Sequence, residues 1–295
     1  MMRRIGSALA ALSLLALPAC GNGQPPSANP AMATMPGPAP LDAAMVTPAF
    51  GWVLTPDELL VSDGGGTFSP VDVPAPAGAV RAAFFVDERR GAVAAAAGGS
   101  ITVATTTDQG RTWRTKRVTD PAASPAGYSS LSLSFGDESH GAIAARVATS
   151  QAFSLATVLV TSDGGRSWAA HPAPEAGVVS VEPGGRIWLA GSALHTSTDH
   201  ARTWTRSELA LSGQPAAVAV TPPAAGTLPA TVLASGPAGD RTEVQLLTTN
   251  DGGLTWGRPD RVPVRGVAGP GVRLAVANLP GGPVVYDNVA GHAYR

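Results

Sequence analysis

The chain is poor in cysteine, in lysine and in charged residues generally. Cys20 is the only cysteine, so no disulfide can form within one molecule. Lys116 is the only lysine, and the 295 residues include 20 basic and 21 acidic ones. The formal net charge of −1 argues against nucleic acid as a partner, because phosphate backbones attract strongly basic surfaces.

Common catalytic and cofactor motifs are missing from the sequence as well. It contains no Gly-x-Ser-x-Gly motif, no phosphate-binding loop and no dinucleotide fingerprint. The five histidines have no metal-ligand spacing, and His195 and His200 flank a turn where we expect them to face solvent. We therefore expect no metal site and no cofactor.

A repeat is present instead. Five copies of an eight-residue pattern, the corner motif, each carry an Asp, a Ser or Thr four residues later, and an aromatic residue directly after that. Five copies in one chain indicate a repeat architecture. The Asp and aromatic residues are Asp63 and Phe68, Asp108 and Trp113, Asp163 and Trp168, Asp199 and Trp204, and Asp251 and Trp256.

The corner motif predicts a hairpin turn. Its Asp can accept hydrogen bonds from backbone N–H groups just ahead of it, and four copies supply a Gly for a positive φ. The aromatic residue begins the return strand and is large enough to fill a gap between neighbouring sheets. We interpret these Asp residues as turn builders rather than as a catalytic or metal-binding cluster.

The spacing of the motif predicts the fold. The Asp residues follow one another at intervals of 45, 55, 36 and 52 residues, close to the length of one four-stranded propeller blade. A second repeat, Phe85 to Val93 and Phe135 to Ile143, predicts a strand, a tight turn and a strand ahead of two corners. We expect an all-β chain with a single β-propeller of four-stranded blades. Six blades are favoured over seven, with Leu41 to Val46 completing the last blade.

In these motifs the chain resembles the Asp-box, or BNR-repeat, β-propellers. That group includes sialidases, sortilin-type receptor domains, some glycoside hydrolases and photosystem II assembly factors. The resemblance covers residues 42 to 295 and implies the propeller fold. It does not imply one activity, because a fold carries many chemistries.

The N-terminal residues predict export of the protein out of the cytoplasm. Residues 1–20 have the basic start and the 13-residue apolar stretch of a signal peptide, too short to span a bilayer stably. Their end, from Leu17 to Gly21, resembles a bacterial lipobox, which implies lipidation of Cys20 and a membrane anchor. An ordinary secretory signal is the alternative. Residues 21–40 predict a disordered Pro/Ala/Gly tether, and residues 41–295 the propeller.

The expected binding surface lies opposite the corners. In a four-stranded blade, the turns joining strands one and two and strands three and four lie on one face, the corner face. Loops joining strands two and three, together with the links between blades, build the other face, the mouth. Candidate binding residues at the mouth are Tyr128, Arg146, Gln151, Asp240, Arg241 and Glu243. Weaker catalytic candidates are the carboxylates Asp57, Glu58, Asp240 and Glu243, although no spacing supports a pair.

We predict a monomeric, lipid-anchored platform that binds an envelope protein or glycan without catalysis. One alternative is a glycoside hydrolase, either sialidase-like or with two carboxylates. Sialidase chemistry needs three arginines that grip a carboxylate, and the regular series Arg111, Arg166 and Arg202 lies on the corner face. The other alternative is a protein resembling the photosystem II assembly factors.

Overall fold

The computed structural model is all-β in the residues that it describes. Backbone and side chains are described for 40–47, 49–62, 67–76, 79–123, 126–147, 155–211 and 245–261, and the backbone alone for 217–221, 230–238, 241–244, 262, 274–279, 282–287 and 293–294. No helix in these ranges is long and apolar enough to cross a bilayer. The predicted signal peptide, Cys20 and nearly all of the tether lie outside them.

The strands form six sheets, which we number as blades in chain order. Blades 1 to 3 contain β1 (Asp42–Met45), β2 (Gly51–Leu54), β3 (Leu59–Ser62), β4 (Phe68–Val71); β5 (Val80–Phe85), β6 (Gly91–Ala97), β7 (Ser100–Thr106), β8 (Arg114–Val118); and β9 (Tyr128–Phe135), β10 (Gly141–Val147), β11 (Ala156–Thr161), β12 (Ala169–Pro172). Blades 4 to 6 contain β13 (Val178–Val181), β14 (Ile187–Ala190), β15 (Leu194–Ser197), β16 (Thr205–Arg206); β17 (Ala217–Thr221), β18 (Ala230–Ala238), β19 (Arg241–Thr249), β20 (Asp260–Val262); and β21 (Leu274–Leu279), β22 (Gly282–Asp287), β23 (Ala293–Tyr294).

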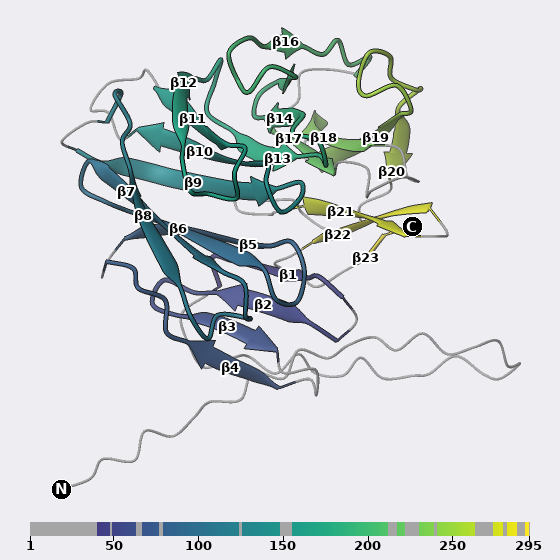
Figure 1. Cartoon of the computed structure of the whole chain (residues 1–295). Helices are drawn as coiled ribbons and strands as arrows, with labels where there is room; N and C mark the ends of the chain where they lie inside the picture. Colours follow the sequence, from purple (N-terminus) through teal and green to yellow (C-terminus); the bar gives the residue numbers. More distant parts are fainter. Residues whose placement is uncertain are drawn as a thin grey trace, which may run out of the picture.

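Each blade is an antiparallel meander whose successive strands are hydrogen-bonded neighbours. The blades follow one another around the molecule, from β1–β4 at the bottom of Figure 1 to β13–β16 at the top and β17–β20 on the right. Their first strands adjoin in series, because β9 contacts β5 and β13, and β17 contacts β13 and β21. This is the predicted β-propeller. Six blades are described, and a total of six rather than seven stays a prediction.

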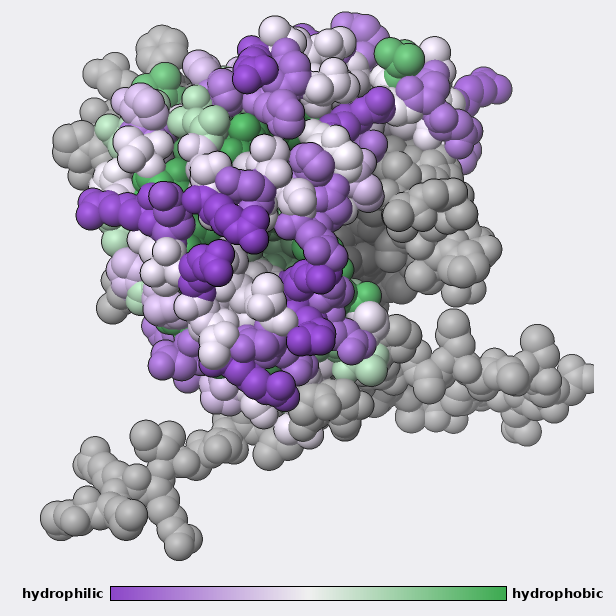
Figure 2. All heavy atoms as spheres, viewed as in Figure 1, coloured by the Kyte–Doolittle hydropathy of each residue, from purple (hydrophilic) through white to green (hydrophobic). Residues whose placement is uncertain are grey.

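Apolar side chains fill the gaps between neighbouring blades. In blade 2, β6 buries the five consecutive residues from Ala92 to Ala96, since a middle strand is covered on both faces. Ile101 and Val103 of this blade pack in one cluster with Leu133 and Ile143 of blade 3. Figure 2 shows hydrophilic side chains over much of the coloured face, with smaller patches of apolar side chains among them. Each blade therefore depends on its neighbours for burial.

The inner strands are joined by serine side chains. A first strand has no strand beyond its inner edge, so the N–H groups there need other acceptors. Ser132 and Ser134 of β9 supply them, because their hydroxyls accept hydrogen bonds from the N–H groups of Val179 and Val181, both at 3.1 Å. Blade 3 is thereby joined to blade 4 next to the propeller axis.

The N-terminal strand does not complete the last blade, contrary to our expectation. β1 pairs with β2 of its own blade, with Ala43 opposite Val53 and Ala44 opposite Trp52. The physical reason is local, since antiparallel pairing across the short link from β1 to β2 closes a small loop at little entropic cost. The stretch Leu41 to Val46 thus supplies the first strand of blade 1.

Candidate functional site

The corner motifs form the predicted turns. In blade 3, the Asp163 carboxylate accepts hydrogen bonds from the Thr161 hydroxyl at 2.8 Å and from the N–H and hydroxyl of Ser167 at 2.9 and 2.6 Å. The Thr161 hydroxyl oxygen in turn accepts the N–H of Gly165 at 2.9 Å. The same bonds recur around Asp108, Asp199 and Asp251. The first corner Asp, Asp63, lies outside the described residues.

These hydrogen bonds fix the charge of the corner carboxylates. The hydroxyl and N–H of Thr112 lower the pKa of Asp108 to about 2. Burial alone would raise the pKa of Asp163, but the Ser167 donors outweigh it and lower that pKa to about 2. Thr255 lowers the pKa of Asp251 to about 2, and Thr203 lowers the pKa of Asp199. A carboxyl that is ionised throughout the physiological range and occupied by its own turn is a structural group rather than a proton donor.

The corner aromatics pack as expected. Trp256 of blade 5 lies edge-on against Trp188 of blade 4, with ring centroids 5.9 Å apart and an interplanar angle of 74°. Trp168 meets Phe135 of its own blade at 6.1 Å and 84°. Trp113 and Trp204 lie partly buried against apolar clusters of the preceding blades. These rings therefore stabilise the joints between blades.

Polar contacts join the blades along the corner face. Each contact starts at a turn between the first two strands of a blade and ends at the next blade. The contacts are the Thr47 hydroxyl to Glu88 at 2.9 Å, the Arg90–Glu138 ion pair, the N–H of Gly184 to Asp137 at 2.9 Å, and the Arg186 guanidinium to the carbonyl of Gly252 at 2.7 Å. Blades 1 to 5 are thus joined in sequence. Several charged side chains of the corner face are therefore engaged in contacts between blades.

A groove with a cavity volume of about 640 Å³ opens between blades 2 and 3 on the corner face. Phe84 supplies aromatic surface, and Arg90, Arg114 and Arg166 supply cations, whereas Trp113 borders the groove but packs its ring in the cluster between blades 1 and 2. Arg90 is paired with Asp87 and Glu138. The exposed side chains of Arg114 and Arg166 have no partner among the described residues. The remaining lining includes hydroxyl and carboxylate groups from Thr105, Thr106, Thr107, Thr112, Asp137, Glu138, Ser139, Ser162 and Asp163.

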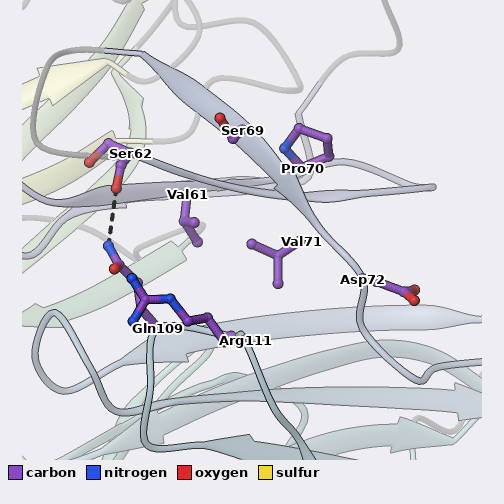
Figure 3. A pocket seen from close by; sticks show the side chains of 9 residues that line it. Val61, Ser62, Ser69, Pro70, Val71, Asp72, Gln109 and Arg111 are labelled. Atoms are coloured by element: carbon purple, nitrogen blue, oxygen red, sulfur yellow. Dashed lines mark hydrogen bonds between the residues drawn. The ribbon is translucent and has the colours of Figure 1, made fainter.

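A smaller groove of about 430 Å³ lies one joint earlier, between blades 1 and 2 (Figure 3). The Gln109 amide donates a hydrogen bond to the carbonyl of Ser62 at 3.2 Å and closes one end. Val61 and Val71 form its apolar floor, and Arg111 lies beside Gln109. It offers one cation and no aromatic ring, so it has fewer ligand-binding groups than the groove between blades 2 and 3.

On the mouth side, Glu175 holds two loops together. It accepts the N–H groups of Ser192 and Ala193, both at 2.9 Å, and the Ser192 hydroxyl. Burial by itself would raise the pKa of Glu175, but these donors outweigh it and lower the pKa. The link before blade 4 is thereby locked to that blade's loop between its second and third strands.

His195 lies against Glu175, contrary to our expectation that it faces solvent. Its side chain is only 13% exposed, and its Nδ1 atom is 3.3 Å from Glu175 Oε1, close but not aligned as a hydrogen bond. Burial lowers the pKa of His195, and the Glu175 charge partly opposes this. Sequence reasoning missed this pair because Glu175 lies in the link before blade 4, whereas His195 lies on β15, two strands later in the chain.

Tyr128 is buried rather than displayed. Its hydroxyl donates a hydrogen bond of 2.8 Å to the Asp120 carboxylate, which also accepts the N–H of Ala122 at 2.9 Å. Burial, followed by the contact with Asp120, raises the pKa of Tyr128. Both side chains are 7% exposed, so the expected ligand contact at Tyr128 gives way to a structural role in the link before blade 3.

The other predicted mouth residues are scattered. Arg146 is exposed at the end of β10, and Asp57 and Glu58 are exposed neighbours in the loop after β2. Gln151 and Asp240 lie outside the described residues, and only the backbone of Arg241 and Glu243 is described. The mouth-side loop on which we expected Asp240, Arg241 and Glu243 is largely strand, since Glu243 pairs with Gly236 and Arg241 with Ala238. Pairing of consecutive residues leaves only positions 239 and 240 between the two strands.

The part of the chain with described side chains contains no group of three or more His, Cys, Asp or Glu residues placed to hold a metal ion. The expectation of no metal for the whole chain stays a prediction.

No description of a known protein family matches the sequence, and no curated protein matches it. Solved structures are similar in fold. An ancestral GH74 enzyme superposes on 87% of this chain with a TM-score of 0.51 and 11% identity, and the chain spans only 38% of that enzyme. The Penicillium chrysogenum alpha-L-arabinanase complexed with arabinobiose superposes on 83% of this chain and 88% of its own, with a TM-score of 0.50 and 15% identity. At such identities the likeness shows the β-propeller fold alone.

Proposed function

We propose that this propeller binds a glycan without hydrolysing it, in the groove between blades 2 and 3, and that lipidated Cys20 anchors it outside the cytoplasm. The observation that carries the proposal is the composition of the groove. It combines aromatic surface at Phe84 with two unpartnered cations, Arg114 and Arg166, in a cavity of about 640 Å³. That volume is in the range of ligand pockets.

Sugars fit this combination of side chains. The C–H face of a pyranose or furanose ring packs on an aromatic ring, and its hydroxyls accept hydrogen bonds from guanidinium groups. The threonine and serine hydroxyls around the groove are further donors and acceptors. The fold likeness to an arabinanase complexed with arabinobiose supports a carbohydrate as the first ligand class to test.

Binding without hydrolysis is favoured by the carboxylates of the groove. A glycosidase needs a carboxylic acid whose pKa is raised, so that it carries a proton at neutral pH. The pKa values of Asp137 and Asp163 are lowered instead, and Glu138 is paired with Arg90. Asp57 and Glu58, the described catalytic candidates, lie on the mouth side, away from this groove.

The test is a glycan screen with a chain of residues 21–295, followed by calorimetry on the best ligand. We expect Arg114→Gln combined with Arg166→Gln to weaken binding by about tenfold or more, since two charge-assisted hydrogen bonds are lost. The matched control is Arg202→Gln, which changes the equivalent corner position in blade 4 and should bind normally.

Three results would contradict the proposal. Turnover of a glycoside that is lost in Asp240→Asn or Glu243→Gln would establish the hydrolase alternative. Binding that survives the groove variants but is lost in Arg146→Gln or Arg241→Gln would move the site to the mouth. A protein recovered with the anchored chain, together with no glycan binding, would favour the protein platform.

A further inference from the structure

The outer strand of blade 2, β8, carries an unusual concentration of positive charge. Seven basic and three acidic residues lie between Val80 and Val118, whereas the whole chain has 20 basic and 21 acidic residues. Four of the seven, Arg111, Arg114, Lys116 and Arg117, lie on or just before β8, and all four are exposed. Among the described residues no side chain forms a hydrogen bond or ion pair with Arg114, Lys116 or Arg117, and Arg111 interacts only at longer range, with the Asp108 carboxylate of its own turn. Strongly hydrophilic side chains gather around this edge in Figure 2.

The other outer strands that the structure describes lack this charge. β4 contains no Lys or Arg, and neither does β12, while β16 and β20 contain one Arg each. β4 and β12 each contain a Pro, which by itself discourages pairing with another sheet edge. Protection of an edge strand therefore does not account for the four exposed cations on and just before β8, because a proline or a single arginine serves at the equivalent described edges.

The cations lie on both sides of the strand. Side chains alternate along a strand, so Arg114 and Lys116 share a side with Val118, which is buried in the cluster between blades 2 and 3. Arg117 points to the opposite side, and Arg111 lines the groove between blades 1 and 2. A ligand seated in one groove could reach only one of these sets. A flat anionic surface that meets the strand edge-on contacts both.

We propose that β8 and Arg111 form a docking surface for the anionic headgroups of a bilayer. The chain length is compatible, since 20 residues separate Cys20 from Leu41 and such a segment spans at most about 70 Å. It enters the fold at blade 1, directly beside blade 2 in chain order. The bilayer then contacts the rim of the propeller and leaves the corner face and the mouth accessible. This inference is independent of glycan binding.

The test uses an unlipidated chain of residues 21–295, which retains every described strand, and flotation with phosphatidylcholine vesicles with or without phosphatidylglycerol. We expect binding only to the anionic vesicles, with loss at high salt. Arg111→Glu, Lys116→Glu and Arg117→Glu together should lower the partition coefficient by about 100-fold, as each basic residue near an anionic surface contributes about a fivefold effect. Arg114 is left intact so that the glycan groove stays unchanged.

The matched control reverses three exposed arginines of other blades, Arg202, Arg206 and Arg258, with the same change in net charge. Retained vesicle binding in the control supports the proposal, and equal loss in both triple variants refutes it as a net-charge effect. If the triple variant does not fold, the milder single variants Lys116→Gln and Arg117→Gln replace it. Unchanged vesicle binding in both of these variants also refutes the proposal. If the chain binds an acidic polysaccharide but not vesicles, and this binding depends on the same residues of β8, the membrane proposal is refuted and the ligand of β8 is a polyanionic glycan.

Discussion

The corner carboxylates should make the stability of the propeller depend on pH, and Asp163→Asn isolates one of them. Asp163 accepts hydrogen bonds from the hydroxyl of Thr161 and from the N–H and hydroxyl of Ser167. Asparagine keeps one acceptor oxygen, which can still serve Thr161 and the Ser167 N–H. Its NH₂ group cannot accept the Ser167 hydroxyl, and the negative charge is gone.

The magnitude follows from the geometry and the pKa. A hydrogen bond to a charged group contributes about 1.5–3 kcal/mol when it is buried, and the open position of Asp163 reduces this to about 1 kcal/mol at pH 7. The folded state lowers the pKa from its ordinary 3.8 to about 2. The contribution is therefore complete above the unfolded pKa and is lost as the pH falls through the folded pKa. By pH 3 about half of the linked stabilisation should be gone.

The assay is urea unfolding followed by tryptophan fluorescence at pH 7 and pH 3. The difference in unfolding free energy between the wild type and Asp163→Asn should shrink by about half at pH 3. Asp57→Asn is the matched control, because that exposed carboxylate has no hydrogen bond among the described residues and its loss should change little. Equal differences at the two pH values would refute the linkage, and no difference at pH 7 would refute the role of the turn.

Three further substitutions test the joints between blades and the mouth-side pair. Gly136→Ala places a new Cβ 2.1 Å from the carbonyl oxygen of Glu182 in the next blade, so blades 3 and 4 must separate; we expect unfolding free energy to fall by about 1–3 kcal/mol in urea titrations. Trp188→Phe removes the 2.7 Å bond from its indole N–H to Glu182 and leaves a gap beside Trp256; we expect a loss of about 2–4 kcal/mol, and a loss below about 1 kcal/mol in thermal or urea unfolding would count against the packing described. Glu175→Gln removes the charge that opposes the effect of burial on His195, so the pKa of that imidazole should fall further in an NMR titration, and a rise would contradict the pairing.

The corners could be predicted because their chemistry is local. Thr161, Asp163, Gly165 and Ser167 form one hydrogen-bonded turn within seven residues, so the sequence pattern alone contains every partner. The fold followed from repeating that turn at the length of a blade. β18 and β19 extend further into the expected mouth-side loop than predicted, because the glycine and proline near the end of β18 resemble loop residues in sequence.

The contacts between blades could not be predicted in the same way, although three of them share one sequence separation. The bonds from Val179 to Ser132, from Val181 to Ser134 and from Gly184 to Asp137 each join residues 47 positions apart. One blade length separates these partners, but the unequal intervals between corners give no indication of which residues face each other. The groove escaped prediction for the same reason, because Arg114 and Arg166 come from different blades and meet only when the ring is assembled.

The charge of the first two blades gives the proposed docking a direction. Blade 1, from Asp42 to Val71, contains four acidic and no basic residues, whereas the adjoining blade 2 has an excess of four basic ones. An anionic bilayer repels the first and attracts the second, so with the proposed anchor at Cys20 the propeller would have one favoured orientation rather than many. In that orientation β8 meets the headgroups. The corner face, with the groove between blades 2 and 3, is then roughly perpendicular to the membrane plane. A glycan held in that groove would then extend alongside the bilayer, a geometry that suits a polymer of the envelope.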